Sequence, residues 1–132
     1  MTNIKPEIHA YMKRAYDMLE VAQHNLDDGY HATAVNRAYY AVFNAANALL
    51  ATKGITRSKH SGVIVAFRQY FVKTGAIEGE YSHVFGQLLD DRNISDYVIL
   101  EEIEAAQAAL DVRDAQRFVE RIAAYLQSGG WR

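Results

Sequence analysis

Apolar residues recur at spacings of three and four along most of the chain, which is the period of an amphipathic helix. This period predicts helices over about residues 6–26, 30–53, 58–74, 78–93 and 101–110, and a last helix that restarts at Asp111 or Asp114 and ends near Gln127. The run VIVAF (63–67) resembles a strand in composition, but it lies inside a helical pattern and is predicted to be helical. The pattern therefore predicts an all-α fold, an antiparallel bundle of four to five main helices.

The helix ends follow from residues that interrupt the apolar pattern. Pro6 fits the first turn of a helix, and glycines follow the ends of the first three predicted helices. The chain has no other proline, so no later helix is broken by one. Residues 94–100 are predicted to form a break between helices, with Ser95 or Asp96 as a candidate cap.

The predicted helix over about residues 30–53 is apolar around most of its circumference, because alanines fill the positions between its larger apolar residues. Such a helix is either central in its own bundle or shared with a second subunit. The sequence leaves both alternatives open, and a homodimer is one of them.

Length and composition narrow the class of protein. The chain has 132 residues and is half hydrophobic, which suits one domain over residues 1–132 with an ordered core over about 6–127. It has no cysteine, which excludes disulfides, thiolate metal sites and cysteine nucleophiles. The histidine spacing does not suit a metal site, and neither a metal nor a cofactor is expected. With no signal or membrane-spanning pattern, a cytoplasmic protein without membrane contact is expected.

The first candidate for chemistry is the polar segment Arg92-Asn93-Ile94-Ser95-Asp96-Tyr97. Arg92 and Asp96 lie four residues apart, so they share a face if the helix continues. One interpretation is an exposed ion pair that stabilises the helix by about 0.3 kcal/mol. The other is an arginine that binds a phosphate beside polar partners.

Two further segments are candidates for ligand binding. No acidic residue occurs from Ala51 to Ile77, and Lys59, His60 and Ser61 lie in this basic stretch at a predicted helix start, where free N–H groups suit an anion. The alternative is a capped helix with solvated lysines. Upstream, the segment Asn36-Arg37-Ala38-Tyr39-Tyr40 contains two candidate ligand-binding residues, Arg37 and Tyr40. On such an apolar helix, Arg37 needs either an acidic partner or a ligand. The alternative for the tyrosines is that they are aromatic residues of the core or of an interface.

Taken together, these segments resemble a HEPN domain of the small, stand-alone prokaryotic kind. The resemblance rests on AVNRAYYAVFNAANALLATKG (34–54), KHSGVIVAFRQYFVKTG (59–75), DDRNISDY (90–97) and AQRFVERIAAYL (115–126), which cover most of the chain. It implies a helical bundle that forms a two-fold homodimer, with the arginine motifs of both subunits at a shared cleft. Many such domains are metal-independent ribonucleases, and some pair as toxins with a small nucleotidyltransferase antitoxin that can adenylylate a tyrosine near the motif.

The family motif is an arginine, usually a polar residue, and a histidine after four to six intervening residues. Here Arg92 and Asn93 match its beginning, while Tyr97 stands where the histidine would be, and no histidine follows Arg92. Three hypotheses follow. The chain is an RNA-directed toxin-like effector in which Arg92, Asn93 and Tyr97 or His60 act. Alternatively, it is a non-catalytic module that binds RNA, a nucleotide or a partner through Arg92, Asp96 and Tyr97, or it is a purely structural dimer.

Overall fold

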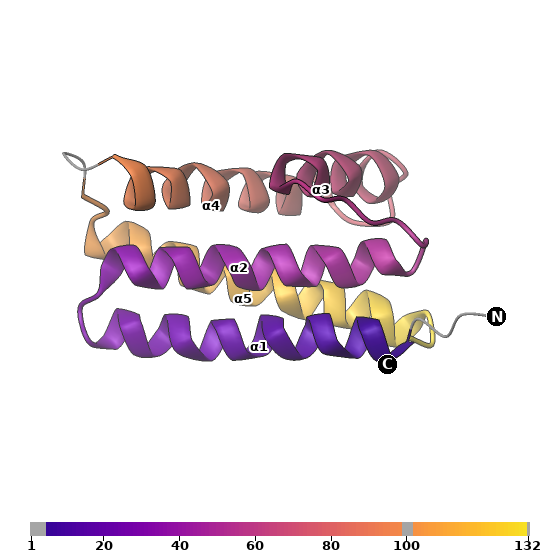
Figure 1. Cartoon of the computed structure of the whole chain (residues 1–132), viewed down its shortest axis with the longest axis horizontal. Coiled ribbons are helices and arrows are strands. Elements are labelled where there is room, and N and C mark those ends of the chain that lie inside the picture. Colours follow the sequence, from indigo (N-terminus) through magenta and orange to yellow (C-terminus); the bar gives the residue numbers. More distant parts are fainter. Residues whose placement is uncertain (1–4, 99–101, 132) are drawn as a thin grey trace.

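The computed structural model describes residues 5–98 and 102–131, and every regular element in these two ranges is helical (Figure 1). The elements are α1 (Lys5–Asp27), α2 (His31–Ala51), α3 (His60–Phe67), the π-helix η1 (Arg68–Val72), α4 (Gly79–Tyr97) and α5 (Ala105–Ser128). This confirms the predicted all-α class and the helical nature of residues 63–67. Within the described ranges, no helix combines the length and the apolar character needed to cross a membrane.

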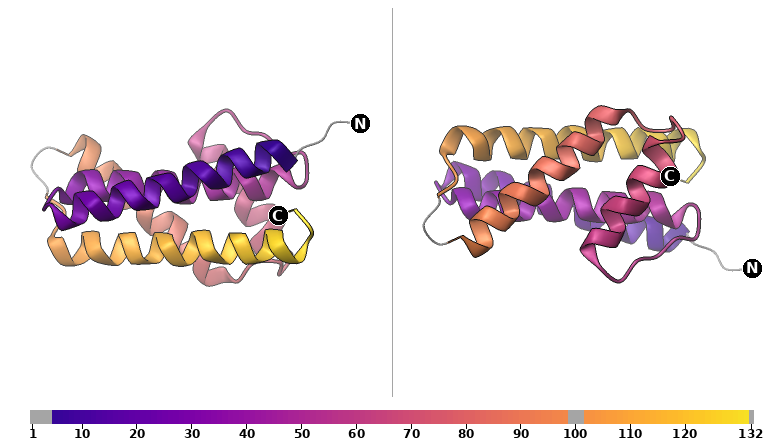
Figure 2. Two further views of the ribbon diagram at one scale, coloured as in Figure 1. Left: turned by 90° about the horizontal axis from the view of Figure 1, so that it is seen from below. Right: turned by 90° about the horizontal axis from the view of Figure 1, so that it is seen from above.

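Helix α2 is the centre of the fold. Helices α1 and α5 run alongside it, and α4 crosses over the α2–α5 layer with α3 beside its first turns (Figures 1 and 2). Thirteen of the 21 residues of α2 are buried, and α2 packs against α1, α3, α4 and α5. Contacts within one chain therefore account for its apolar breadth, and the predicted homodimer rests on the family resemblance rather than on this helix.

Aromatic rings join α3, α4 and α5 above α2. The side chain of Phe67 lies 5.7 Å from that of Phe85 and 5.4 Å from that of Phe118 between ring centroids, and all three are fully buried. Tilted aromatic pairs at such distances add to the free energy gained by burying the rings. This packing fixes the position of α4 over α2, which is the position that matters for the site below.

Two predicted helix boundaries are wrong. Helix α4 continues to Tyr97 instead of ending near Asn93, so Ser95 and Asp96 are interior residues and neither is a cap. Here Ser95 Oγ donates to the carbonyl of Arg92 at 3.1 Å, and Asp96 pairs with Arg92 one turn earlier, so both side chains support the helix that they were expected to end. Of the predicted break, residues 99–100 lie outside the described residues.

The second correction concerns the last helix, which does not restart at Asp111 or Asp114. Helix α5 is continuous from Ala105 to Ser128, with Glu104 as its N-cap residue. Asp111 is 1% exposed and accepts a hydrogen bond from Gln107 one turn earlier, so it belongs to the interior of the helix. The predicted start at Glu101 falls outside the described residues.

Candidate functional site

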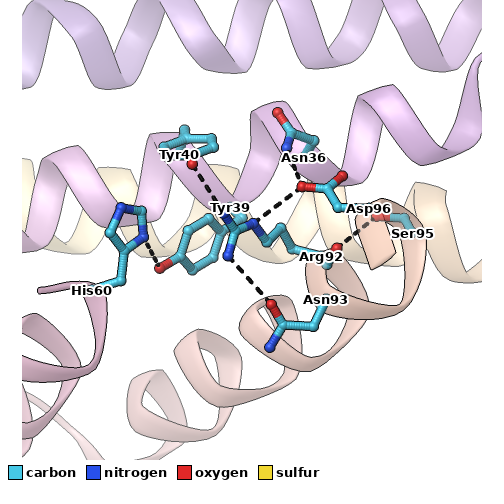
Figure 3. Close-up of polar contacts among 8 residues, drawn as sticks. All are labelled: Asn36, Tyr39, Tyr40, His60, Arg92, Asn93, Ser95 and Asp96. Carbon is cyan, nitrogen blue, oxygen red and sulfur yellow. Dashed lines mark hydrogen bonds and ion pairs between the residues drawn. The ribbon is translucent and has the colours of Figure 1, made fainter. Parts of the chain in front are cut away.

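The last two turns of α4 bring Arg92 against α2, and its guanidinium is held from three sides (Figure 3). Nη2 donates to the Tyr40 hydroxyl at 3.1 Å, and Nη1 donates to Asn93 Oδ1 at 3.3 Å. Nε lies 3.2 Å from Asp96 Oδ2. The ion pair between Arg92 and Asp96 that the sequence suggested is therefore present, but it is largely buried rather than exposed, since the Arg92 side chain is only 13% exposed.

Three tyrosine rings surround the same guanidinium. Its central carbon lies 5.2 Å from the ring centroid of Tyr39, 5.6 Å from that of Tyr40 and 5.5 Å from that of Tyr97. A cation within about 6 Å of a ring is attracted by the electrons of the ring. Tyr39 is fully buried, whereas Tyr97 is 69% exposed, so the tyrosines cover the cation from the protein interior to the solvent.

Asp96 joins α4 to α2 and compensates the charge of Arg92. Besides the ion pair, Asp96 Oδ2 accepts a hydrogen bond from Asn36 Nδ2 at 2.8 Å. The contact with Arg92 is electrostatic rather than well aligned, because Arg92 Nε is buried and has no hydrogen-bond partner among the described residues. One donor of the guanidinium thus stays incompletely satisfied beside a carboxylate that is 26% exposed.

His60, at the start of α3, lies on the other side of the same tyrosines. Its Nδ1 is 2.9 Å from the Tyr39 hydroxyl, and its ring stacks on Phe43 with the centroids 4.2 Å apart. Burial raises the pKa of Tyr39 to about 12, despite the opposing charge of Arg92. Burial, followed by the Arg92 charge, lowers the pKa of His60, so both groups are neutral near neutral pH.

The remaining predicted site residues are dispersed. Arg37 has no hydrogen bond or ion pair with any residue that the structure describes, so it lacks the acidic partner that its helix suggested. It lines an open groove of about 400 Å³ beside Asp96, bounded also by Ala32, Thr33, Asn36 and Ser95. Lys59 and Ser61 are exposed on either side of His60, and no contact joins them to Arg92. The structure thus gathers Tyr40, Asn93, Asp96 and Tyr97 around Arg92 and places His60 next to this group.

Sequence analysis missed Phe43, and it placed Asn36 and Tyr39 in a separate candidate segment rather than in the Arg92 site. Their signal is a spacing of three or four along α2, which puts them on one face with Tyr40. The spacing alone did not show that this helix face meets α4 and α3, because that depends on the tertiary fold.

A second polar group was also missed, on the α5 side of α4. Asp91 and Asp111 are both buried, and Gln107 Nε2 bridges them at 3.2 Å and 2.9 Å. Burial first, and then the neighbouring Asp91, raises the pKa of Asp111 to about 8. In the described ranges, no three histidine, aspartate or glutamate side chains are grouped so as to hold a metal ion.

Comparison with known proteins shows the family to which the chain is similar. A family model described as the HEPN domain matches residues 8–128. A UPF0332 protein of Thermotoga maritima is 37% identical over 115 residues, which are 87% of each chain. Two Methanocaldococcus jannaschii proteins are also similar. "Putative toxin MJ0605" is 36% identical over 91% of this chain and 89% of its own, and "Putative toxin MJ0142" is 30% identical over 94% and 84%.

Proposed function

This chain belongs to the HEPN family, and from that premise we propose that it is a toxin-like effector that acts on RNA, with Arg92 binding an RNA phosphate. The observation that carries the proposal is the geometry of Arg92, a partly buried cation with an incompletely satisfied donor, between two helices of the bundle. A planar guanidinium matches phosphate oxygens better than an ammonium does. The toxin names of two relatives supply the cellular role.

For a phosphate to bind Arg92, the carboxylate of Asp96 must move away from the guanidinium. Its carboxylate now stands beside Nε of Arg92 and accepts from Asn36, so it occupies the position that an anionic ligand would take. Asp96 is 26% exposed and lines the groove that also contains Arg37. A phosphate that displaces it would meet the donors of Arg92 and the Nδ2 donor of Asn36, with the donors of Arg37 close by. Asp96 thus keeps the cation compensated until a ligand arrives.

In the cleavage reaction proposed for this site, Arg92 stabilises the charge that develops on the phosphate and Asn93 orients it. Tyr97 is the exposed hydroxyl nearest to the motif, in the position of the family histidine. A phenol in the place of an imidazole is a poorer general base. Losing a positioned acid–base group costs about 10² to 10⁴ in rate, so we expect slow, metal-independent cleavage.

We further propose that the chain acts as a homodimer and that a small nucleotidyltransferase is its antitoxin. The family resemblance supports both partners, and the 69% exposure of Tyr97 leaves its hydroxyl accessible to a modifying partner. Analytical ultracentrifugation tests the first part directly: a dimer is expected, and a monomer at all concentrations would contradict it.

The effector role is tested by expressing the protein in bacteria and following growth. Wild type is expected to arrest growth, and Arg92→Ala is expected to relieve the arrest while circular dichroism still reports a helical fold. Arg113→Ala removes an exposed arginine of α5 and serves as the matched control, which should arrest growth like the wild type. Equal arrest by wild type and Arg92→Ala would contradict the proposal.

A second candidate function is a non-catalytic module that binds RNA or a nucleotide. It is favoured by the chemistry around Arg92, where the described neighbours are tyrosines, a carboxylate and amides, and His60 is engaged by Tyr39. Incubating purified protein with RNA in EDTA separates the two. Cleavage that Arg92→Ala abolishes supports the effector, whereas RNA that is bound through Arg92 and stays intact supports the binding module.

A further inference from the structure

The side chain of His60 packs among aromatic rings beside the Arg92 site. Phe43 stacks parallel to its imidazole at 4.2 Å, and the Tyr40 ring meets it edge-on at 5.7 Å. Its Nδ1 is bound to the Tyr39 hydroxyl, whereas its Nε2 has no hydrogen-bond partner in the part of the chain that the structure describes. One nitrogen is thus committed to the protein and the other is left for a ligand.

The burial of Tyr39 fixes the direction of this hydrogen bond. The phenol carries one hydrogen, and His60 Nδ1 is its only hydrogen-bond partner among the described residues. A buried hydroxyl that donates to nothing is costly, so the phenol donates and Nδ1 accepts. A neutral imidazole has one lone pair and one N–H, so Nδ1 as acceptor leaves the hydrogen on Nε2.

Charge around the ring keeps it in this neutral form. Burial and the positive charge of Arg92 on α4 both lower the pKa of His60. The facing groups on α2 are the phenols of Tyr39 and Tyr40, and Lys59 precedes the ring in sequence. No carboxylate contacts the imidazole among the residues described, so nothing there favours the imidazolium.

Arg92 and His60 are held by the same two tyrosines. The Tyr40 hydroxyl accepts from Arg92 while its ring contacts His60, and the Tyr39 ring lies under the guanidinium while its hydroxyl binds the imidazole (Figure 3). The two side chains come from α4 and from α3, which approach this face of α2 from different directions. Both nitrogen donors therefore flank one tyrosine pair.

We propose that His60 is a second ligand contact of this site, donating a hydrogen bond from Nε2 to an oxygen of a second RNA phosphate, on the other side of the tyrosine pair from the phosphate that Arg92 binds. This inference rests on the proposed function, and it excludes His60 as the base that would deprotonate a 2′-hydroxyl, because its lone pair is already used by Tyr39. Tyr39 is the positioning residue, since it acts on the ligand only through the tautomer of His60.

Nitrogen NMR of the histidine rings tests the tautomer without any ligand. Long-range proton–nitrogen spectra of the wild type should show His60 with its hydrogen on Nε2 from about pH 6.5 to 8. Tyr39→Phe removes the donor to Nδ1 and should give a mixture of tautomers. A hydrogen on Nδ1 in the wild type, or an unchanged tautomer in Tyr39→Phe, would overturn the assignment.

Binding of a short fluorescein-labelled single-stranded RNA, followed by anisotropy, tests the contact. His60→Ala should weaken binding about tenfold, the loss expected for one hydrogen bond to a charged acceptor. His60→Gln retains an amide N–H donor and should bind within about threefold of the wild type, as should the control His83→Ala, a change at an exposed histidine of α4.

The outcomes separate this inference from the proposed function. If Arg92→Ala weakens RNA binding and His60→Ala does not, the His60 contact is wrong and the function stands. If the wild type binds no RNA, both are wrong. If His60→Gln loses as much affinity as His60→Ala, a donor of fixed tautomer is not the contact.

Discussion

Asp91 and Arg92 are neighbours on α4, yet they bury charge in opposite ways. Arg92 lies against α2, and its charge is compensated by a carboxylate and an amide of its own helix, a hydroxyl of α2 and three aromatic rings. Asp91 faces α5, where its partner is a second buried carboxyl group, Asp111, bridged by Gln107. Two like charges so close cannot both be ionised at low cost, so this side depends on a proton. One turn of helix thus carries a compensated cation on one face and a carboxyl pair that depends on a proton on the other.

The largest expected effect is on the carboxyl side. The raised pKa of Asp111, about 8 against 3.8 in an unfolded chain, means that the folded state binds more protons between these values. The free energy of unfolding therefore falls as pH rises through this window, by up to about 1.4 kcal/mol per pH unit. Asp111→Asn imitates the protonated form and should remove this slope, which urea unfolding at about pH 5.5 and 8.5 would measure.

A substitution at an exposed carboxylate serves as the control for the pH dependence of unfolding. Asp17→Asn removes an exposed carboxylate of α1 that pairs with Lys13, and it should leave the pH slope of the wild type in place. If Asp111→Asn were as sensitive to alkaline pH as the wild type, the proton shared between α4 and α5 would not be the cause. The substitution should also leave RNA binding near neutral pH unchanged, because Asp111 is already protonated there.

The two faces also differ in how far the sequence predicted them. The pair Arg92 and Asp96 was found from its spacing of four residues, because both partners lie on one helix. The helical state of residues 94–97 was missed, since their polarity suggested a loop and their stabilising partners lie on α2. The helices were predicted well from the spacing of apolar residues, because that spacing determines which face of a helix is buried.

The position of Asp111 explains why the pair of Asp91 and Asp111 was not predicted from the sequence. It lies on the apolar stripe of its helix, between Ala108 and Ala115, and a carboxylate on such a stripe was interpreted as a helix start. The alternative, a buried acid stabilised by Asp91 of another helix, depends on a contact that no local pattern contains. For the same reason, Tyr39 and His60 were separate candidates until the fold joined them.

A smaller effect is expected from removing the cation. Arg92→Ala should lower the free energy of unfolding by about 2 kcal/mol, because Asp96 loses its counter-ion while three tyrosines lose a cation they partly enclose. Asp96 is partly exposed and keeps its hydrogen bond with Asn36, which limits the loss. The loss should be the same at about pH 7 and 8.5, where His60 is neutral, unlike that on the carboxyl side. A pH-dependent loss would show that the two faces are coupled through α4.

The smallest effect, and the sharpest probe of the arginine side, is expected from Tyr40→Phe. The ring, its contact with His60 and its attraction for the guanidinium all remain, and only the hydroxyl that accepts from Arg92 Nη2 is lost. One hydrogen bond to a charged group at a partly exposed position is worth about 1 kcal/mol. Thermal unfolding of Tyr40→Phe, Arg92→Lys and the double variant isolates it, since Lys keeps the charge but not the forked donors. If the two changes are additive, the hydroxyl does not hold Arg92, and the aromatic rings with Asp96 are sufficient to place the guanidinium.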